Sequence, residues 1–196
     1  MPVLVPLVEG QSEERALGVL LRRLIAAGDA PETEIARPFR VPRNKVVREG
    51  ELERAVAQAV RSRSGATAVL IVLDADEDCA AELAPTLVLR GSTASQLPIG
   101  VVLPTVEIEA WILAAVESLR EVRGIRADAR PPADVEGVRD AKGALTQRMT
   151  GARGYVATDD MPALFAAMDV GIAERRSPSM AKLVREVRRL CAASTT

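Results

Sequence analysis

Acidic residues that follow apolar runs are the strongest candidates for chemistry in this sequence. Glu9 follows the run VLVPLV, while Asp74 and Asp76 follow the run ATAVLIVL. In an open parallel sheet, functional groups gather beyond the carboxyl ends of the strands. If these two runs form neighbouring strands, their carboxylates meet and supply the hard oxygen ligands that suit Mg²⁺ or Mn²⁺. We therefore predict a divalent-metal site formed by Glu9, Asp74 and Asp76.

The spacing of the two aspartates supports this prediction. An extended D-x-D segment projects alternate side chains to the same side, so both carboxylates could bind one cation while Ala75 turns away. Asp78 continues the acidic pattern. A cap on the helix that begins there is the favoured role for Asp78, and a metal ligand is the alternative. For Glu9 alone, the simpler interpretation is a solvated charge before a turn at Gly10.

The composition excludes several other kinds of active site. The chain has 196 residues, no histidine and 2 cysteines, Cys79 and Cys191. Without histidine there is no Ser-His-Asp or Cys-His nucleophile system and no imidazole zinc site. The cysteines are too few for a disulfide framework or a thiolate zinc cluster. The formal net charge of −1 differs from the basic balance of a dedicated nucleic-acid binder, so any such contact must be local.

The elements that must position the carboxylates alternate between strand and helix. The apolar runs 3–8, 66–73 and 99–103 are typical of strands buried on both faces of a parallel sheet. The stretch 34–41, with Pro38 inside it and Pro42 after it, is predicted to be an edge strand or an extended loop. Helical periodicity follows the strands at residues 12–27, with Ser12 as N-cap, and at 49–63, 79–89 and 106–119. This pattern predicts an α/β fold with a Rossmann-like, doubly wound, mainly parallel four-stranded sheet flanked by helices.

The rest of the chain is predicted to be helical. Residues 123–138 are rich in proline, glycine and charge and should form a linker, and short helical periodicities follow at 140–149, 161–168 and 179–190. We expect a core at 1–122 and a helical C-terminal extension at 123–196, packed together as a single compact domain. No apolar stretch reaches the about 18 residues of a membrane span, and the start lacks signal-peptide features. We therefore expect a cytoplasmic protein without membrane contact.

Several segments resemble known families. VEGQSEE and LDADED together resemble the Toprim signature, found in topoisomerases, primases and overcoming-lysogenization-type nucleases. The further segments PTVEIEAWILA, DAKGAL and SPSMAKL extend a resemblance to the bacterial Toprim-like domain of unknown function 4276 over nearly the whole chain. The resemblance implies a Toprim-like fold, with Glu9 as general acid/base or metal ligand and Asp74 and Asp76 as Mg²⁺ ligands.

The same resemblance draws attention to a later acidic segment. Glu107 and Glu109 match the family's E-x-E-A-W pattern, which implies that one of them could complete the metal site. Stabilisation of a helix dipole is an equal alternative. Lys142 could contact a phosphate or orient a carboxylate, although a solvated lysine is the simpler interpretation. Trp111, the only tryptophan, is interpreted as a core anchor.

The carboxylates and the resemblance together predict a metal-dependent phosphodiesterase, specifically a Toprim-type nuclease that acts on DNA in a bacterial phage-defence module. Basic residues at 37–48 and 175–189 could contact a phosphate backbone or be solvated surface. The resemblance also implies an ATPase partner, and a homo-oligomer is an open alternative to a monomer. The rival function is a catalytically silent Toprim-like module that regulates or binds a partner. A receiver-type phospho-acceptor fits less well, because only Glu9 follows the first strand.

Overall fold

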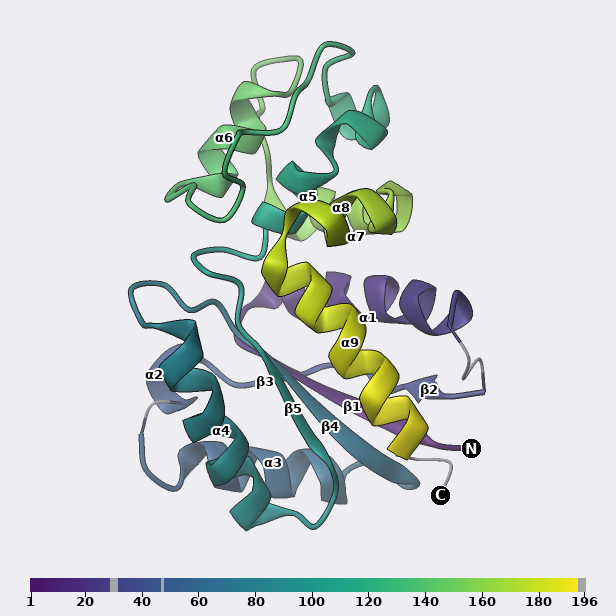
Figure 1. Cartoon of the computed structure of the whole chain (residues 1–196), viewed down its shortest axis with the longest axis vertical. Helices are drawn as coiled ribbons and strands as arrows, with labels where there is room; N and C mark the ends of the chain where they lie inside the picture. Colours follow the sequence, from purple (N-terminus) through teal and green to yellow (C-terminus); the bar gives the residue numbers. More distant parts are fainter. Residues whose placement is uncertain (29–31, 47, 194–196) are drawn as a thin grey trace.

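A parallel sheet lies at the centre of the computed structural model, which describes residues 1–28, 32–46 and 48–193 (Figure 1). The strands are β1 (Val3–Val8), β2 (Glu34–Ile35), β3 (Phe39–Arg40), β4 (Ala66–Val72) and β5 (Ile99–Val102). Their order is β2-β1-β4-β5, with β3 also paired to β1, and all these pairings are parallel. The α/β fold is confirmed. The stretch 34–41 forms two short strands instead of one, because Pro38 between them has no N–H to donate.

β1 and β4 are neighbours in the sheet, as the predicted metal site requires. Leu4 pairs with Ala68, and the register continues to Val8 and Val72 at the ends of the two strands. Every residue of β1 is buried. Successive side chains enter different cores, since Leu4 and Val8 belong to one apolar cluster and Val5 and Leu7 to the other. This two-sided burial is the reason for the continuous apolar run in the sequence.

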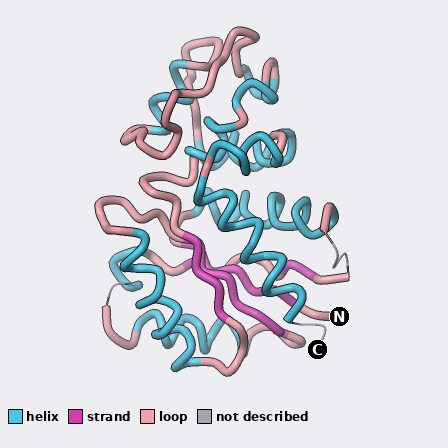
Figure 2. Tube along the Cα trace, in the orientation of Figure 1, coloured by secondary structure: helices cyan, strands magenta, loops and turns pink. Residues whose placement is uncertain are grey.

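Helices cover both faces of the sheet (Figures 1 and 2). On one face lie α1 (Gln11–Ala26) and α9 (Pro178–Ala193), and on the other lie α3 (Glu51–Arg61) and α4 (Ala80–Ala94). The short helix α2 (Arg43–Val46) precedes α3. None of the described helices is long and apolar enough to cross a membrane.

Two predicted helix caps are wrong. The N-cap of α1 is Gly10, no side chain caps this helix, and Ser12 lies inside its first turn. The N-cap of α4 is Cys79, again without a side-chain hydrogen bond. Asp78 is not a cap because its carboxylate forms an ion pair with Arg43, a residue that is distant in sequence.

The single helix predicted at 106–119 is shorter and interrupted. It consists of α5 (Ala110–Ala114) and the 3₁₀ helix η1 (Val116–Leu119). Ala115 between them has φ −110° and ψ 14°, which breaks the regular helical backbone. Trp111 is fully buried, as expected of a core anchor, and its Nε1 donates to Ser179 Oγ at 2.8 Å.

The C-terminal region contains η2 (Val122–Gly124), α6 (Ala141–Gln147), α7 (Ala157–Ala167), α8 (Val170–Arg176) and α9. The sequence patterns missed α8, which begins after Asp169, whose side chain accepts a hydrogen bond from Ile172 N at 2.9 Å. Phe165 and Leu190 of this region share one apolar cluster with Leu4 of β1, so the extension packs directly on the sheet layer.

Glu136 joins three parts of the chain in this packing. Its carboxylate accepts hydrogen bonds from Thr105 Oγ1 at 2.7 Å, from Ser179 N at 2.8 Å and from the hydroxyls of Ser177 and Ser179. Burial alone would raise the pKa of Glu136, but these hydrogen bonds outweigh burial and lower it. The charged form of Glu136 therefore stabilises the fold.

We predict that Glu136→Gln lowers the free energy of unfolding at pH 7 by about 2 kcal/mol, the usual scale for hydrogen bonds to a charged group. Because the folded-state pKa lies below the ordinary value of 4.5, this contribution is present above about pH 4.5 and is lost as the pH falls through the folded-state pKa. Chemical denaturation between pH 7 and pH 3 measures the effect, with the exposed Glu34→Gln as the control. Equal stability of the two variants at pH 7 would contradict the prediction.

Candidate functional site

The ends of β1 and β4 bring Glu9 and Asp74 to the same edge of the sheet. Val8 and Val72 are register partners, and both strands run in the same direction. The chain stays extended beyond β4, because Ala75 N donates to Pro104 O at 2.8 Å. Asp74 Oδ1 accepts a hydrogen bond from Ile108 N at 2.9 Å, which joins this strand end to the start of α5.

The carboxyl groups at this edge lie in surroundings that disfavour negative charge. The pKa of Asp74 is raised to about 8, first by burial and then by the charges of Glu109, Glu13 and Glu9. Burial and the charge of Asp76 raise the pKa of Glu9, even though Arg43 and Lys142 act in the opposite direction. The pKa of Glu109 is also raised, chiefly by burial. We call Glu9, Asp74 and Glu109 the carboxylate cluster.

Two oxygens of the carboxylate cluster are buried without a hydrogen bond. They are Glu9 Oε2 and Glu109 Oε2. Glu109 is 1% exposed, and its other oxygen accepts from Tyr155 OH at 3.3 Å. Glu109 Oε2 lies 3.4 Å from Lys142 Nζ, within ion-pair range but without a hydrogen bond. A buried acceptor with no donor costs about 1–3 kcal/mol and calls for an explanation such as a bound ion.

Glu107 has a different set of contacts from Glu109. Its carboxylate accepts from Ala141 N at 2.8 Å and Lys142 N at 3.3 Å, at the start of α6, and pairs with Lys142 Nζ. Burial lowers the pKa of Lys142, but the charges of Glu109 and Glu107 outweigh burial and raise it overall. Glu107 lies before α5 and supports α6, so it does not stabilise the dipole of the helix predicted at 106–119.

Asp76 and Asp78 lie on the exposed rim beside Arg43. Asp76 has φ 54°, so the D-x-D segment is not extended at its second aspartate, and that part of the prediction is wrong. Arg43 Nε is 3.9 Å from Asp76 Oδ2, and Arg43 also pairs with Asp78. The same guanidinium donates to Asp74 O at 2.5 Å and to Ala75 O at 3.3 Å. Arg43 thus holds the acidic turn in place.

Three residues at this edge make contacts that the sequence analysis did not predict. Arg40 Nε donates to Glu9 O at 3.1 Å, so it positions the first strand end. Glu13 lies in the first turn of α1, and its charge raises the pKa of both Glu9 and Asp74. A Cβ at Gly10 would lie 2.0 Å from Glu13 Oε2, so glycine leaves room for this carboxylate. The third residue is Tyr155, whose hydroxyl donates to Glu109. It is the single tyrosine of the chain, and no other feature of the sequence could have drawn attention to it.

The carboxylate oxygens of the cluster are of a kind that suits a hard divalent cation, although they are not arranged as a complete metal site. Across residues 1–28, 32–46 and 48–193, no group of three or more His, Cys, Asp and Glu side chains is arranged to hold a metal ion. Carboxylate oxygens without hydrogen bonds are nevertheless the ligands that Mg²⁺ and Mn²⁺ prefer. A cation at this edge would need these ligands to be rearranged, and Glu9, Asp74 and Glu109 are the candidates, since the charges of Glu9 and Glu109 both raise the pKa of Asp74.

The fold and this edge define an α/β protein of Rossmann-like architecture with a partly buried carboxylate cluster. The family model of a domain of unknown function, DUF4276, matches residues 8–188, and the chain belongs to this family. No curated protein and no solved structure matches the chain. The match spans the whole carboxylate cluster.

We predict that the metal-free protein loses stability as the pH rises from about 4 to about 8. The folded state favours the protonated form of Asp74, whose pKa rises from 3.8 to about 8, so its contribution is complete below pH 3.8 and is lost above pH 8. Asp74→Asn should reduce this slope and raise the free energy of unfolding at pH 8 by roughly 1–3 kcal/mol, because it removes the charge and keeps the shape. Urea denaturation in chelator at pH 5 and pH 8 measures both effects.

The control for this prediction is Glu77→Gln, which neutralises an exposed carboxylate three residues away. A variant Asp74→Asn that is less stable than the parent protein at pH 8 would show that the charge of Asp74 is structural.

Proposed function

We propose that this protein is a Mg²⁺- or Mn²⁺-dependent phosphodiesterase of the Toprim type, which cleaves nucleic acid, with DNA the favoured substrate, in the cytoplasm. The observation that carries the proposal is the carboxylate cluster, where Glu9 and Glu109 each bury an oxygen without a hydrogen bond. Such unsatisfied acceptors at the carboxyl ends of parallel strands are characteristic of sites that bind a ligand.

The residues of the cluster have separate roles in this proposal. A bound divalent cation would polarise a phosphoryl oxygen and favour attack by water. Asp74 and Glu109 would hold the cation, and Asp74 is kept in place by the backbone N–H of Ile108. Glu9 acts as general acid or base, because its raised pKa brings proton exchange closer to neutral pH.

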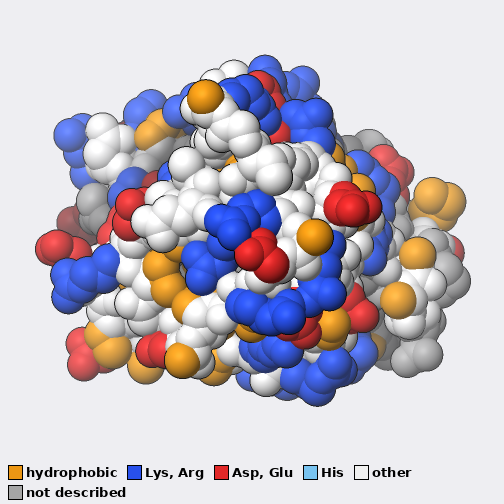
Figure 3. Space-filling model, turned by 90° about the horizontal axis from the view of Figure 1, so that it is seen from above, with side chains coloured by type: hydrophobic (Ala, Val, Ile, Leu, Met, Phe, Trp, Pro, Cys, Tyr) orange, Lys and Arg blue, Asp and Glu red, His pale blue; other side chains and the backbone are white. Residues whose placement is uncertain are grey.

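Basic side chains around the cluster support an anionic substrate. Arg40 and Arg43 lie on the side of the strand ends, and Lys142, with 46% of its side chain exposed, lies on the side of α6. The end of the molecule that carries α6 also displays many Lys and Arg side chains, interspersed with Asp and Glu (Figure 3). Cations in this arrangement attract a phosphate backbone locally, although the net charge of the chain is −1.

A second candidate is a catalytically silent Toprim-like module that regulates or binds a partner. One observation favours it: the ammonium of Lys142 already contacts both Glu107 and Glu109, and an internal cation of this kind can replace a metal. The ATPase partner and the role in phage defence that the Toprim resemblance implies are compatible with either candidate.

We predict that the protein cleaves DNA with Mg²⁺ or Mn²⁺ and not in excess chelator. Asp74→Asn and Glu9→Gln should each lower the rate at least about 100-fold, the usual scale for removing a general acid/base or a charge that stabilises the transition state. Linear and circular DNA, single- and double-stranded, are incubated with each variant, and products are followed by electrophoresis. Glu77→Gln is the matched control. Full activity of Asp74→Asn would refute the proposed role of Asp74.

We also predict that millimolar Mg²⁺ or Mn²⁺ raises the melting temperature, because a cation that binds only the folded state stabilises it by mass action. The double variant Asp74→Asn, Glu109→Gln should lose this shift while remaining folded. Differential scanning calorimetry of both proteins, with metal and with chelator, measures it. Stabilisation by metal without DNA cleavage would favour the silent module, whereas the absence of any shift in the parent protein would count against a metal site.

A further inference from the structure

Arg40 differs from the other cations at the edge of the sheet that carries the carboxylate cluster. The guanidinium of Arg43 pairs with Asp78, and the ammonium of Lys142 pairs with Glu107. Arg40 is exposed and has no ion-pair partner among residues 1–28, 32–46 and 48–193. Its positive charge therefore lies beside the cluster without a carboxylate of the described chain to neutralise it.

The backbone places Arg40 next to Glu9. Val8 of β1 and Arg40 of β3 are register partners, and Val41 N donates to Val8 O at 2.7 Å. Arg40 Nε donates to Glu9 O at 3.1 Å, which anchors the side chain to the main chain of Glu9. The nitrogens Nη1 and Nη2 of Arg40 have no hydrogen bond within the described part of the chain. In a planar guanidinium these two nitrogens form a fork that fits two oxygens of a phosphate.

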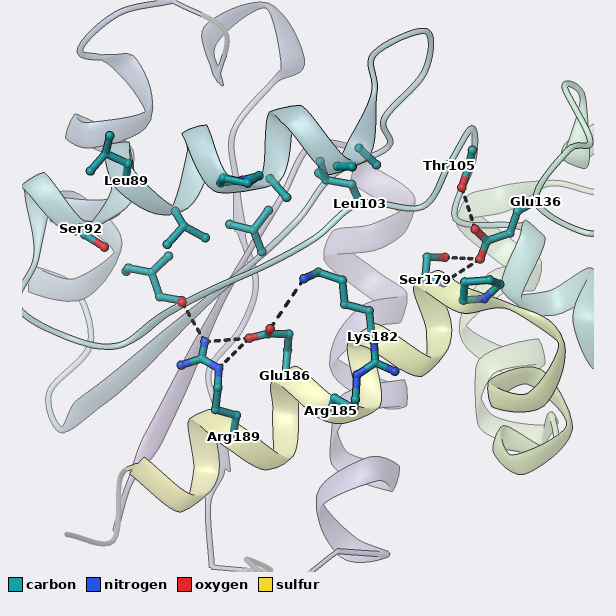
Figure 4. Close-up of a pocket in the computed structure, with 18 residues that line it drawn as sticks. Leu89, Ser92, Leu103, Thr105, Glu136, Ser179, Lys182, Arg185, Glu186 and Arg189 are labelled. Atoms are coloured by element: carbon teal, nitrogen blue, oxygen red, sulfur yellow. Dashed lines mark hydrogen bonds and ion pairs between the residues drawn. The ribbon is translucent and has the colours of Figure 1, made fainter.

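Arg189 shows the same kind of contact with its charge satisfied. It lies in the groove between α4 and α9, where its Nη2 donates to Ile99 O at 2.9 Å (Figure 4). The guanidinium of Arg189 also pairs with Glu186 at 2.7 Å. Both arginines are bonded to a backbone carbonyl, but only Arg189 has a carboxylate as well. The charge of Arg40 is thus available to an anion from outside the chain.

We infer, on the basis of the proposed phosphodiesterase function, that Arg40 binds a phosphate next to the scissile one and so favours a polynucleotide over an isolated phosphodiester. A polynucleotide carries a phosphate at every nucleotide, so a second phosphate accompanies the one that is attacked. Contacts to such phosphates fix the position of a nucleic acid on a protein without reading its sequence. Arg40 is therefore a residue for substrate binding and not for the chemical step.

The contacts of Arg40 favour the neighbouring phosphate over the scissile one. Arg40 is bonded to the main chain of Glu9 and forms no ion pair with the carboxylates of Glu9, Asp74 or Glu109. It therefore lies beside the groups that would hold the cation and the scissile phosphate. The bond from Nε also restricts the side chain before the substrate arrives, which reduces the rotamer entropy that is lost on binding.

DNA binding is the first measurement that tests this role. Fluorescence anisotropy with labelled single-stranded and duplex DNA, in chelator to prevent cleavage, gives the dissociation constants of the parent protein and Arg40→Gln at several salt concentrations. Loss of one phosphate contact should weaken binding roughly tenfold and reduce the slope of log affinity against log salt by about 1. Arg40→Lys keeps the charge without the planar fork and should bind with intermediate affinity.

The second measurement separates the neighbouring phosphate from the scissile one. With Mg²⁺ or Mn²⁺, kcat/KM is determined for DNA and for bis(p-nitrophenyl) phosphate, a diester that has no second phosphate. Arg40→Gln should lower kcat/KM for DNA roughly tenfold, mainly through KM, and leave kcat/KM for the small diester unchanged. The rise in melting temperature with metal should also be unchanged, because Arg40 forms no ion pair with the carboxylate cluster.

Arg61→Gln is the matched control for the change in charge. Arg61 is exposed, ends α3 and precedes the amino end of β4, so it lies at the opposite edge of the sheet. This variant should bind and cleave DNA like the parent protein.

Three results would overturn the role of Arg40: an unchanged affinity and salt slope in Arg40→Gln, equal losses with both substrates, or a loss accompanied by a lower melting temperature in chelator. A parent protein that does not bind DNA would overturn this role together with the proposed function. A parent protein that binds DNA but cleaves neither substrate would overturn the proposed function alone, and the salt dependence of binding would then decide whether Arg40 contacts a phosphate.

Discussion

Val8 and Val72 are partners at the ends of two buried parallel strands, and this pairing determines where the acidic residues of the chain meet. A shift of one residue in the register would move Asp74 along the strand by about 3.3 Å relative to Glu9 and away from the N–H of Ile108. The neighbouring groups depend on the same alignment. Arg40 contacts the carbonyl of Glu9, and Arg43 contacts the carbonyl of Asp74, so the backbone of both strand ends is held by side chains from the β3–α2 segment.

The protein treats its buried acidic residues in two different ways. Asp160 is fully buried, yet it accepts hydrogen bonds from Arg123, Arg153 and Val156 N, and its pKa is lowered. Glu136 is similarly saturated with donors and also has a lowered pKa. Glu109 is as buried as a core residue, but one of its oxygens has no hydrogen bond and its pKa is raised. The same fold can therefore satisfy a buried carboxylate fully, and the unsatisfied oxygen of Glu109 is the exception on which the proposed metal site rests.

The segment that follows β5 connects the carboxylate cluster to the C-terminal helices. Thr105 of this segment is hydrogen bonded to Glu136, while Glu107 and Glu109 reach Lys142 and the cluster. This segment therefore joins the helical C-terminal region to the strand ends that carry the carboxylates.

The sequence by itself determined the parallel α/β architecture and the importance of the acidic strand ends. A continuous apolar run indicates a strand that is buried on both faces of the sheet. A carboxylate that follows such a run must lie at the carboxyl end of that strand. Only the tertiary structure decided which charges act together. Lys142 meets Glu107 and Glu109, and Arg43 draws Asp78 away from its expected capping role. These contacts join segments separated by more than 30 residues, and such pairs are set by how helices pack on the sheet, which local periodicity does not encode.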